Sequence, residues 1–157
     1  MEPSGYRRVL LGFRRWRYFS KCSISTDTLP ACFKYHRNKL YFGTVEGQLD
    51  MIDFGFHNAV SSLATADNNG RIFCIDVKED ILVAGHEDGS IRFHNPGGSG
   101  GSCLSSLAIT NSPIVFIRIL SSRATEGARI LCWSREGDCY LVSPHRDINI
   151  IGRSGNC

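Results

Sequence analysis

The 157-residue sequence contains no run of eighteen apolar residues, so no segment is expected to cross a membrane as a helix. Its 16 glycines follow no three-residue period, which excludes a collagen-like triple helix. A helical period of apolar residues is also absent, which argues against a helical bundle. With 42% hydrophobic and 21% charged residues, the chain is long and apolar enough to fold around a core.

Motifs that mark familiar enzymes and metal sites are missing. The sequence has no C-x-x-C pair, no G-x-S-x-G elbow, no P-loop and no H-E-x-x-H motif. No two of the five histidines stand at metal-ligand spacing from each other. We therefore expect no catalytic, metal-binding or cofactor-binding residue and no cofactor, and we interpret the protein as a non-enzyme.

Seven cysteines are present, and most lie inside apolar runs such as 72–75 and 130–133. In such runs a cysteine behaves as a small buried hydrophobic side chain. The odd number and the surroundings favour reduced thiols over disulfides, which is typical of a reducing compartment. We expect an intracellular protein, either cytoplasmic or nuclear.

Positive charge is concentrated at the N-terminus. Residues 1–21 carry a net charge of +5, whereas the rest of the chain sums to −2. The main interpretation is a solvated, arginine-rich hairpin, and contact with nucleic acid is a lesser alternative. The arginines concerned are Arg7, Arg8, Arg14, Arg15 and Arg17. No membrane partner is expected.

An internal repeat organises the chain. Residues 39–53 align with 81–95 at a spacing of 42, which places Gly43 on Gly85 and Gly47 on Gly89. A third copy, residues 129–143, places Glu136-Gly137 a further 48 residues on. Each copy has an apolar run, an acidic-glycine turn and an alternating run, which predicts a β-hairpin.

Further strands flank each hairpin. Residues 31–36, 73–78 and 114–120 predict a strand before it, and Cys32 aligns with Cys74. Residues 61–64 and 105–108 share the sequence Ser-Ser-Leu-Ala and predict a fourth strand between repeats. Four short antiparallel strands in about 42 residues indicate an all-β fold of β-propeller blades.

At this point the sequence resembles the WD-repeat family. Residues 49–53, Leu-Asp-Met-Ile-Asp, resemble the Trp-Asp end of the third strand of a blade, with isoleucine in place of tryptophan. The matching positions are His94-Asn95 and Val142-Ser143, so the motif degrades along the chain. The resemblance covers residues 22–151 and implies a shortened or partial propeller, because three blades do not close a ring.

The predicted organisation has three parts. Residues 1–21 form a basic segment, either an edge strand or a partial blade. Three blades follow, at 22–60, 61–102 and 103–151, and then a tail at 152–157. Residues 97–102 read as a Gly/Ser linker, either of the flexible kind used in engineered proteins or a natural loop.

The candidate site is a set of charged residues in the loops that a propeller of this type gathers on one face. Together they would form a surface able to hold a basic peptide, although turns favour the same residue types for local reasons. The residues are Glu46, Asp67, Glu87, Asp88, Arg135 and Glu136, with Asp27 nearby.

These features favour a non-catalytic protein-interaction scaffold that binds through blade loops or edge strands. The expected partner is another protein or a second copy that completes the propeller. One alternative is a ligand-binding or enzymatic propeller whose site spans several blades. Another is a substrate-recognition propeller of an F-box-like ubiquitin ligase adaptor, since residues 12–18 resemble the aromatic-basic end of that helical motif.

Overall fold

A computed structural model describes residues 8–15, 18–25, 28–55, 59–64, 70–97, 103–121, 127–143 and 148–152, and of residues 8–25 the backbone alone. All secondary-structure elements in these ranges are β-strands. They form three four-stranded antiparallel sheets and one two-stranded sheet. The all-β prediction and the four-stranded repeat are confirmed. No described helix is long and apolar enough to cross a membrane.

Each four-stranded sheet follows chain order, so it is an antiparallel meander. The first sheet contains β3 (Pro30–His36), β4 (Lys39–Thr44), β5 (Leu49–Asp53) and β6 (Ala59–Ala64). The second contains β7 (Ile72–Lys78), β8 (Ile81–His86), β9 (Ser90–His94) and β10 (Ser105–Ala108). The third contains β11 (Ile114–Ser121), β12 (Arg129–Ser134), β13 (Cys139–Val142) and β14 (Ile148–Gly152).

The strands that lie between two repeats belong to the sheet before them in the chain. β6 pairs with β5 of the first sheet, and β10 pairs with β9 of the second. The sheets therefore span 30–64, 72–108 and 114–152. The division at 22–60, 61–102 and 103–151 instead gives residues 61–64 and 105–108 to the following unit. The boundary depends on which strands pair, and an alignment of the repeats carries no information about strand pairing.

The N-terminal segment forms a hairpin of β1 (Arg8–Arg15) and β2 (Tyr18–Ser25), which pair with each other. The F-box-like helical interpretation is therefore wrong for residues 12–15, which lie in a strand. Of the basic residues, Arg8, Arg14 and Arg15 lie in β1, whereas Arg7 and Arg17 lie outside the described residues. Most of the Gly/Ser linker and of the C-terminal tail also lies outside them.

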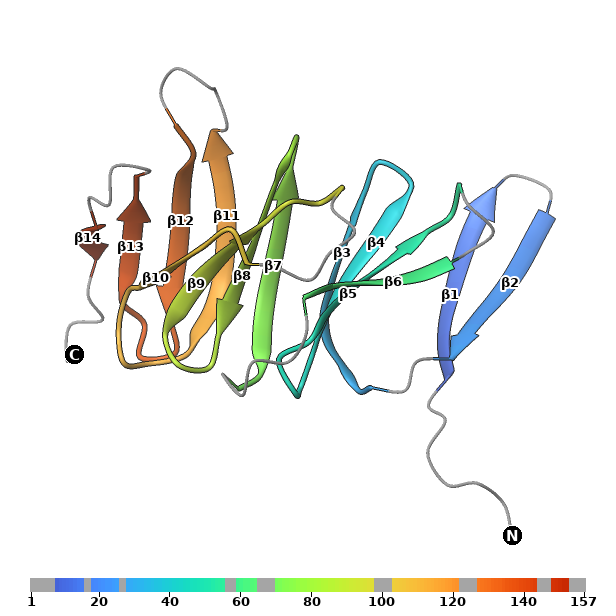
Figure 1. Cartoon of the computed structure of the whole chain (residues 1–157), viewed down its shortest axis with the longest axis horizontal. Helices are drawn as coiled ribbons and strands as arrows, with labels where there is room; N and C mark the ends of the chain where they lie inside the picture. The colour runs from blue at the N-terminus through green and yellow to red at the C-terminus, as the bar shows by residue number, and fades with distance from the viewer. Residues whose placement is uncertain are drawn as a thin grey trace, which may run out of the picture.

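The sheets stand side by side in a row, with the first strands β3, β7 and β11 adjacent (Figure 1). Alternate side chains of the middle sheet face opposite neighbours. Leu82 and Ala84 pack with Tyr41 and Leu49 of the first sheet. Val83 packs with Ile117 and Ile130 of the third sheet, so β8 is covered on both faces.

A glycine and a cysteine form a notch at each junction between sheets. A Cβ on Gly43 would meet Ile72 Cγ2 at 2.5 Å, and one on Gly85 would meet Ile114 Cγ2 at 2.8 Å. The thiol of Cys32 donates to the carbonyl oxygen of Ile72 at 3.6 Å, and Cys74 donates to that of Ile114 at 3.3 Å. The first residue of the next sheet's first strand therefore fits into this notch.

Both notch cysteines are free thiols, as are Cys103, Cys132 and Cys139. Burial raises the pKa of Cys32 to about 11 and that of Cys132 to about 12. A protonated thiol is a poor nucleophile, so Cys32 and Cys132 serve packing rather than reactivity.

Candidate interaction surfaces

The turns that join second and third strands lie along one edge of the row of sheets (Figure 1). Their glycines Gly47, Gly89 and Gly137 have φ angles of 88°, 78° and 93°. Each glycine N–H donates to the carbonyl oxygen three residues earlier, at 3.2, 3.2 and 3.0 Å. The predicted acidic-glycine hairpins are present, and glycine occupies the position where the backbone must be left-handed.

Each turn is tied to the segment that enters its own sheet. The N–H of the residue after the second strand donates to a carbonyl just before the first strand. The three bonds are Val45 to Leu29 at 3.1 Å, Glu87 to Arg71 at 2.9 Å and Arg135 to Pro113 at 2.8 Å. We call the surface made by residues 45–48, 87–89 and 135–138 the turn face.

The turn face carries five of the predicted site residues, all of them exposed. They are Glu46, Glu87, Asp88, Arg135 and Glu136. Asp67 lies outside the described residues, as does Asp27. The exposed Arg71 enters the second sheet beside Glu87. The turns therefore gather charged groups of both signs from three sheets.

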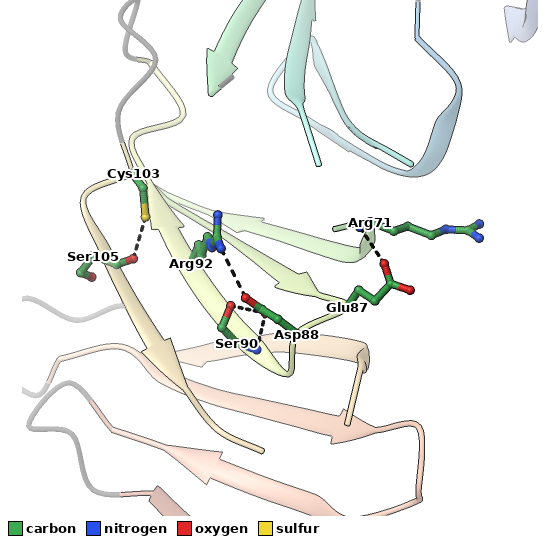
Figure 2. A network of polar contacts seen from close by, with 7 residues as sticks. All are labelled: Arg71, Glu87, Asp88, Ser90, Arg92, Cys103 and Ser105. Carbon is green, nitrogen blue, oxygen red and sulfur yellow. Dashed lines mark hydrogen bonds and ion pairs between the residues drawn. The ribbon is translucent and has the colours of Figure 1, made fainter. Parts of the chain in front are cut away.

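In the middle sheet the acidic side chains also hold the turn in shape (Figure 2). Glu87 Oε2 accepts from the backbone N–H of Arg71 at 3.2 Å. Asp88 Oδ1 accepts from Ser90 N–H at 2.9 Å and from Ser90 Oγ at 2.6 Å, and Oδ2 lies 3.4 Å from Arg92. Partial burial works to raise the pKa of Asp88, but these hydrogen bonds and Arg92 outweigh it and lower that pKa.

The last residue of the second strand is polar and buried in all three sheets: Thr44, His86 and Ser134. Thr44 Oγ1 accepts from Gln48 N–H at 3.0 Å, and Ser134 Oγ accepts from Asp138 N–H at 3.2 Å. In the middle sheet Asp88 Oδ1 accepts the equivalent bond, from Ser90 N–H. Position 86 therefore does not need a hydroxyl group, and it holds a histidine. Burial, followed by the nearby Arg92 charge, lowers the pKa of His86 to about 4.

A buried carboxylate connects the first strands of all three sheets. Asp76 is 4% exposed in the middle of β7. Its Oδ1 lies 2.7 Å from Lys34 Nζ of β3, and its Oδ2 accepts from Ile119 N–H of β11 at 2.7 Å. Lys78 adds a bond from its Nζ to the carbonyl oxygen of Leu120 at 2.8 Å.

The third sheet has one face that no other described sheet covers, which we call the open face. The opposite face of the third sheet is buried against the middle sheet, through residues such as Ile117, Ile130 and Tyr140. On the open face Phe116 and Trp133 pack edge to face, with ring centroids 5.3 Å apart, and are 44% and 36% exposed.

Sequence reasoning missed the Asp76 connection and the open face, although the repeat carries a signal for both. Positions 34, 76 and 118 are spaced by 42 and hold Lys, Asp and Arg. Phe116 and Trp133 stand where the other copies have cysteine and glycine, since Phe116 pairs with Trp133 as Cys32 pairs with Gly43. Side-chain alternation then assigns these positions to a face.

Among the described residues no group of three or more His, Cys, Asp and Glu side chains is placed to hold a metal ion. His57 and His145 lie outside those residues.

Several solved structures share this fold. The WD40 beta propeller domain of Doa1 is 14% identical, with a TM-score of 0.69 over 92% of this chain and 46% of that one. A chain of the mitotic checkpoint complex is 17% identical, with a TM-score of 0.68 over 88% of this chain and 43% of that one. The computationally designed Ika8 protein is 15% identical, with a TM-score of 0.63 over 82% of this chain and 37% of that one.

The fold is therefore that of a partial, WD-like β-propeller with three four-stranded blades. This chain spans less than half the length of each of those three solved chains. No protein-family model matches the sequence, and no curated protein matches it significantly.

Proposed function

We propose that the protein is a non-catalytic interaction scaffold that binds another protein chain through its open face, with the turn face as a second contact. The observation that carries the proposal is the exposed Phe116–Trp133 pair on a sheet whose other face is buried. Contiguous exposed apolar side chains are uncommon on monomeric proteins unless they bind something. Tryptophan in particular is enriched among residues that dominate binding energy.

The fold supports this proposal. WD40 propellers commonly serve as protein-interaction scaffolds, and one of the solved chains with this fold belongs to the mitotic checkpoint complex. An intracellular location is part of the proposal, because the described cysteines are free thiols, as is typical of a reducing compartment.

The proposal is tested by affinity capture with three variants of the immobilised chain beside the wild type. The open-face variant is Phe116→Ser with Trp133→Ser, and the turn-face variant is Glu46→Lys. The matched control is Asp80→Lys, because Asp80 is exposed in the turn that follows β7, away from the turn face. We expect a captured protein that the open-face variant loses and the control retains. Equal capture by all versions, or none by any, would contradict the proposal.

A further inference from the structure

We infer that the occupant of the open face is a second copy of this chain, which enters with the face of its first sheet that points away from the middle sheet. We call this the entry face. The inference rests on the proposed function and names the partner. Three four-stranded sheets from each of two copies, joined head to tail, give six, which lies within the four to eight blades typical of a closed propeller.

The two junctions inside the chain show how one sheet receives the next. At each junction a glycine and a cysteine form the notch, and an isoleucine of the next sheet fills it. Ile72 lies against Gly43, and Ile114 lies against Gly85. A small receiving position is therefore matched by a large entering residue.

At the two ends of the row these sizes are reversed. On the open face Trp133 stands at the glycine position and Phe116 at the cysteine position, so rings of the third sheet occupy the notch. The entering position of the first sheet is Pro30, which begins β3 in the register that Ile72 has in β7. Proline is smaller than isoleucine. The large receiving pair is therefore matched by a small entering residue, as packing at this contact requires.

The entry face also exposes two aromatic side chains where the other sheets have core residues. Phe33 and Tyr35 are 70% and 49% exposed. The equivalent side chains of the second sheet, Ile75 and Val77, are only 8% and 4% exposed, because they pack against the first sheet. A sheet that arrives on β3 would cover Phe33 and Tyr35 in the same way. Both ends of the row thus carry exposed aromatic groups at positions that the repeat uses for contact between sheets.

The charges at this contact are also compatible. Inside the chain, Asp76 accepts from the backbone N–H of Ile119 in the next sheet. Arg118 holds the equivalent position on the open face, and Tyr35 is the equivalent of Ile119 on the entering copy. The guanidinium would therefore lie beside an exposed aromatic ring, which is a favourable contact. Lys34 of the entering copy lies 2.7 Å from its own Asp76, so its charge is already paired.

The contact involves mainly the first strands of the two sheets. Further from β3 the entry face is already buried at Leu40, Phe42 and Ile52. Contacts of small area bind weakly and reversibly. Self-association should therefore depend on concentration, and a dilute chain is a single row of sheets with its open face uncovered.

The test exchanges the size match between the two ends. The notch variant, Phe116→Cys with Trp133→Gly, copies the notch of the first two sheets. The filling variant, Pro30→Ile, copies the residue that fills it. Leu104→Ser is the matched control, because it removes an exposed apolar side chain just before β10 of the middle sheet. Sedimentation velocity over a range of concentrations measures the association of each full chain, alone and with the two variants in equal mixture.

We expect the wild type to approach the mass of two chains as its concentration rises, and the control to match it. Each variant alone should associate at least about tenfold more weakly, because the notch variant leaves a cavity and the filling variant overpacks the aromatic pair. The equal mixture should recover most of the lost affinity. In a head-to-tail pair of the two variants, isoleucine meets the notch at one contact and proline meets the rings at the other.

A wild-type chain that keeps the mass of one chain at concentrations up to about 1 mM, or a mixture that associates no better than its components, would overturn the inference. If a variant does not fold, Phe33→Ser decides instead, because Phe33 is exposed and its replacement leaves the core intact. Self-association unchanged by Phe33→Ser would then overturn the inference.

These outcomes are separate from the test of the proposed function. A chain that does not self-associate leaves the proposed function standing, because its open face could still capture a different protein. Only equal behaviour of the open-face variant and the control in affinity capture removes the proposed function itself.

Discussion

Gly89 has a stronger steric requirement for glycine than its repeat partner Gly137. Both have a positive φ, but Gly89 is buried, and a Cβ there would collide with the carbonyl oxygen of Thr110. Gly137 is exposed. The left-handed backbone alone costs a substituted residue about 1–3 kcal/mol, and the collision adds to that at Gly89.

We therefore predict that Gly89→Ala lowers the free energy of unfolding more than Gly137→Ala does, as measured by urea denaturation. Gly97→Ala is the control, because Gly97 has no positive φ and its nearest neighbour would lie 3.6 Å from the new Cβ. Equal losses at positions 89 and 137 would show that packing against Thr110 contributes nothing.

His86 makes the stability depend on pH. Folding lowers its pKa from 6.5 to about 4, so below pH 6.5 the unfolded chain binds a proton that the folded chain resists. The stabilisation is complete above pH 6.5 and is lost progressively as the pH falls towards 4, by at most about 3 kcal/mol. Three neighbours also act on the pKa of His86: Arg92 and His94 lower it, and Asp88 raises it.

The matched variant is His86→Thr, which copies Thr44 of the first sheet and offers its hydroxyl to Ser90 N–H. We predict that its free energy of unfolding changes less between pH 6.5 and pH 4 than that of wild type. Parallel pH profiles for the two proteins would assign the acid sensitivity to other groups.

Strand positions could be predicted from the sequence because three aligned copies reinforce one another. The strand predicted at residues 105–108 occupies those same residues, and that predicted at 73–78 begins one residue earlier. The assignment of fourth strands to sheets was not available, because β6 and β10 lie between repeats and pairing alone decides their membership. The local hydrogen bonds of Glu87 and Asp88 were equally out of reach, because acidic turn residues look the same whether they bind a partner or their own backbone.

The strands β3, β7 and β11 form a coupled unit through Asp76. We predict that Asp76→Ala lowers the free energy of unfolding by about 2–4 kcal/mol, because it leaves the Ile119 N–H and the Lys34 ammonium without their acceptor. Lys34→Ala should cost only about 0–1 kcal/mol, since the Lys34 side chain is 30% exposed and partly solvated.

A double-mutant cycle of Asp76→Ala and Lys34→Ala, followed by chemical denaturation, measures the coupling. The two losses should be non-additive. Additive losses, or a loss for Asp76→Ala no larger than that for the exposed Asp80→Ala, would show that Asp76 does not stabilise the contact between the sheets.

At the scale of the whole molecule, the row of sheets has a protected middle and less protected ends. Side chains of β8 are fully buried at Leu82, Val83 and Ala84, because sheets cover both of its faces. The third sheet is covered on one face, and its open face exposes Phe116 and Trp133. Local opening should therefore cost most in the middle sheet and least at the ends.

We predict that amide hydrogen exchange is slowest in β8 and β9 and faster in β11, β12 and β13. Adding a protein that is captured through the open face should slow exchange in β11 and β12 while β8 stays as it was. The Phe116→Ser, Trp133→Ser variant mixed with the same protein is the control and should show no such slowing. Uniform protection across all three sheets in the isolated protein would contradict the prediction, because it would mean that the uncovered face of the third sheet costs it no local stability.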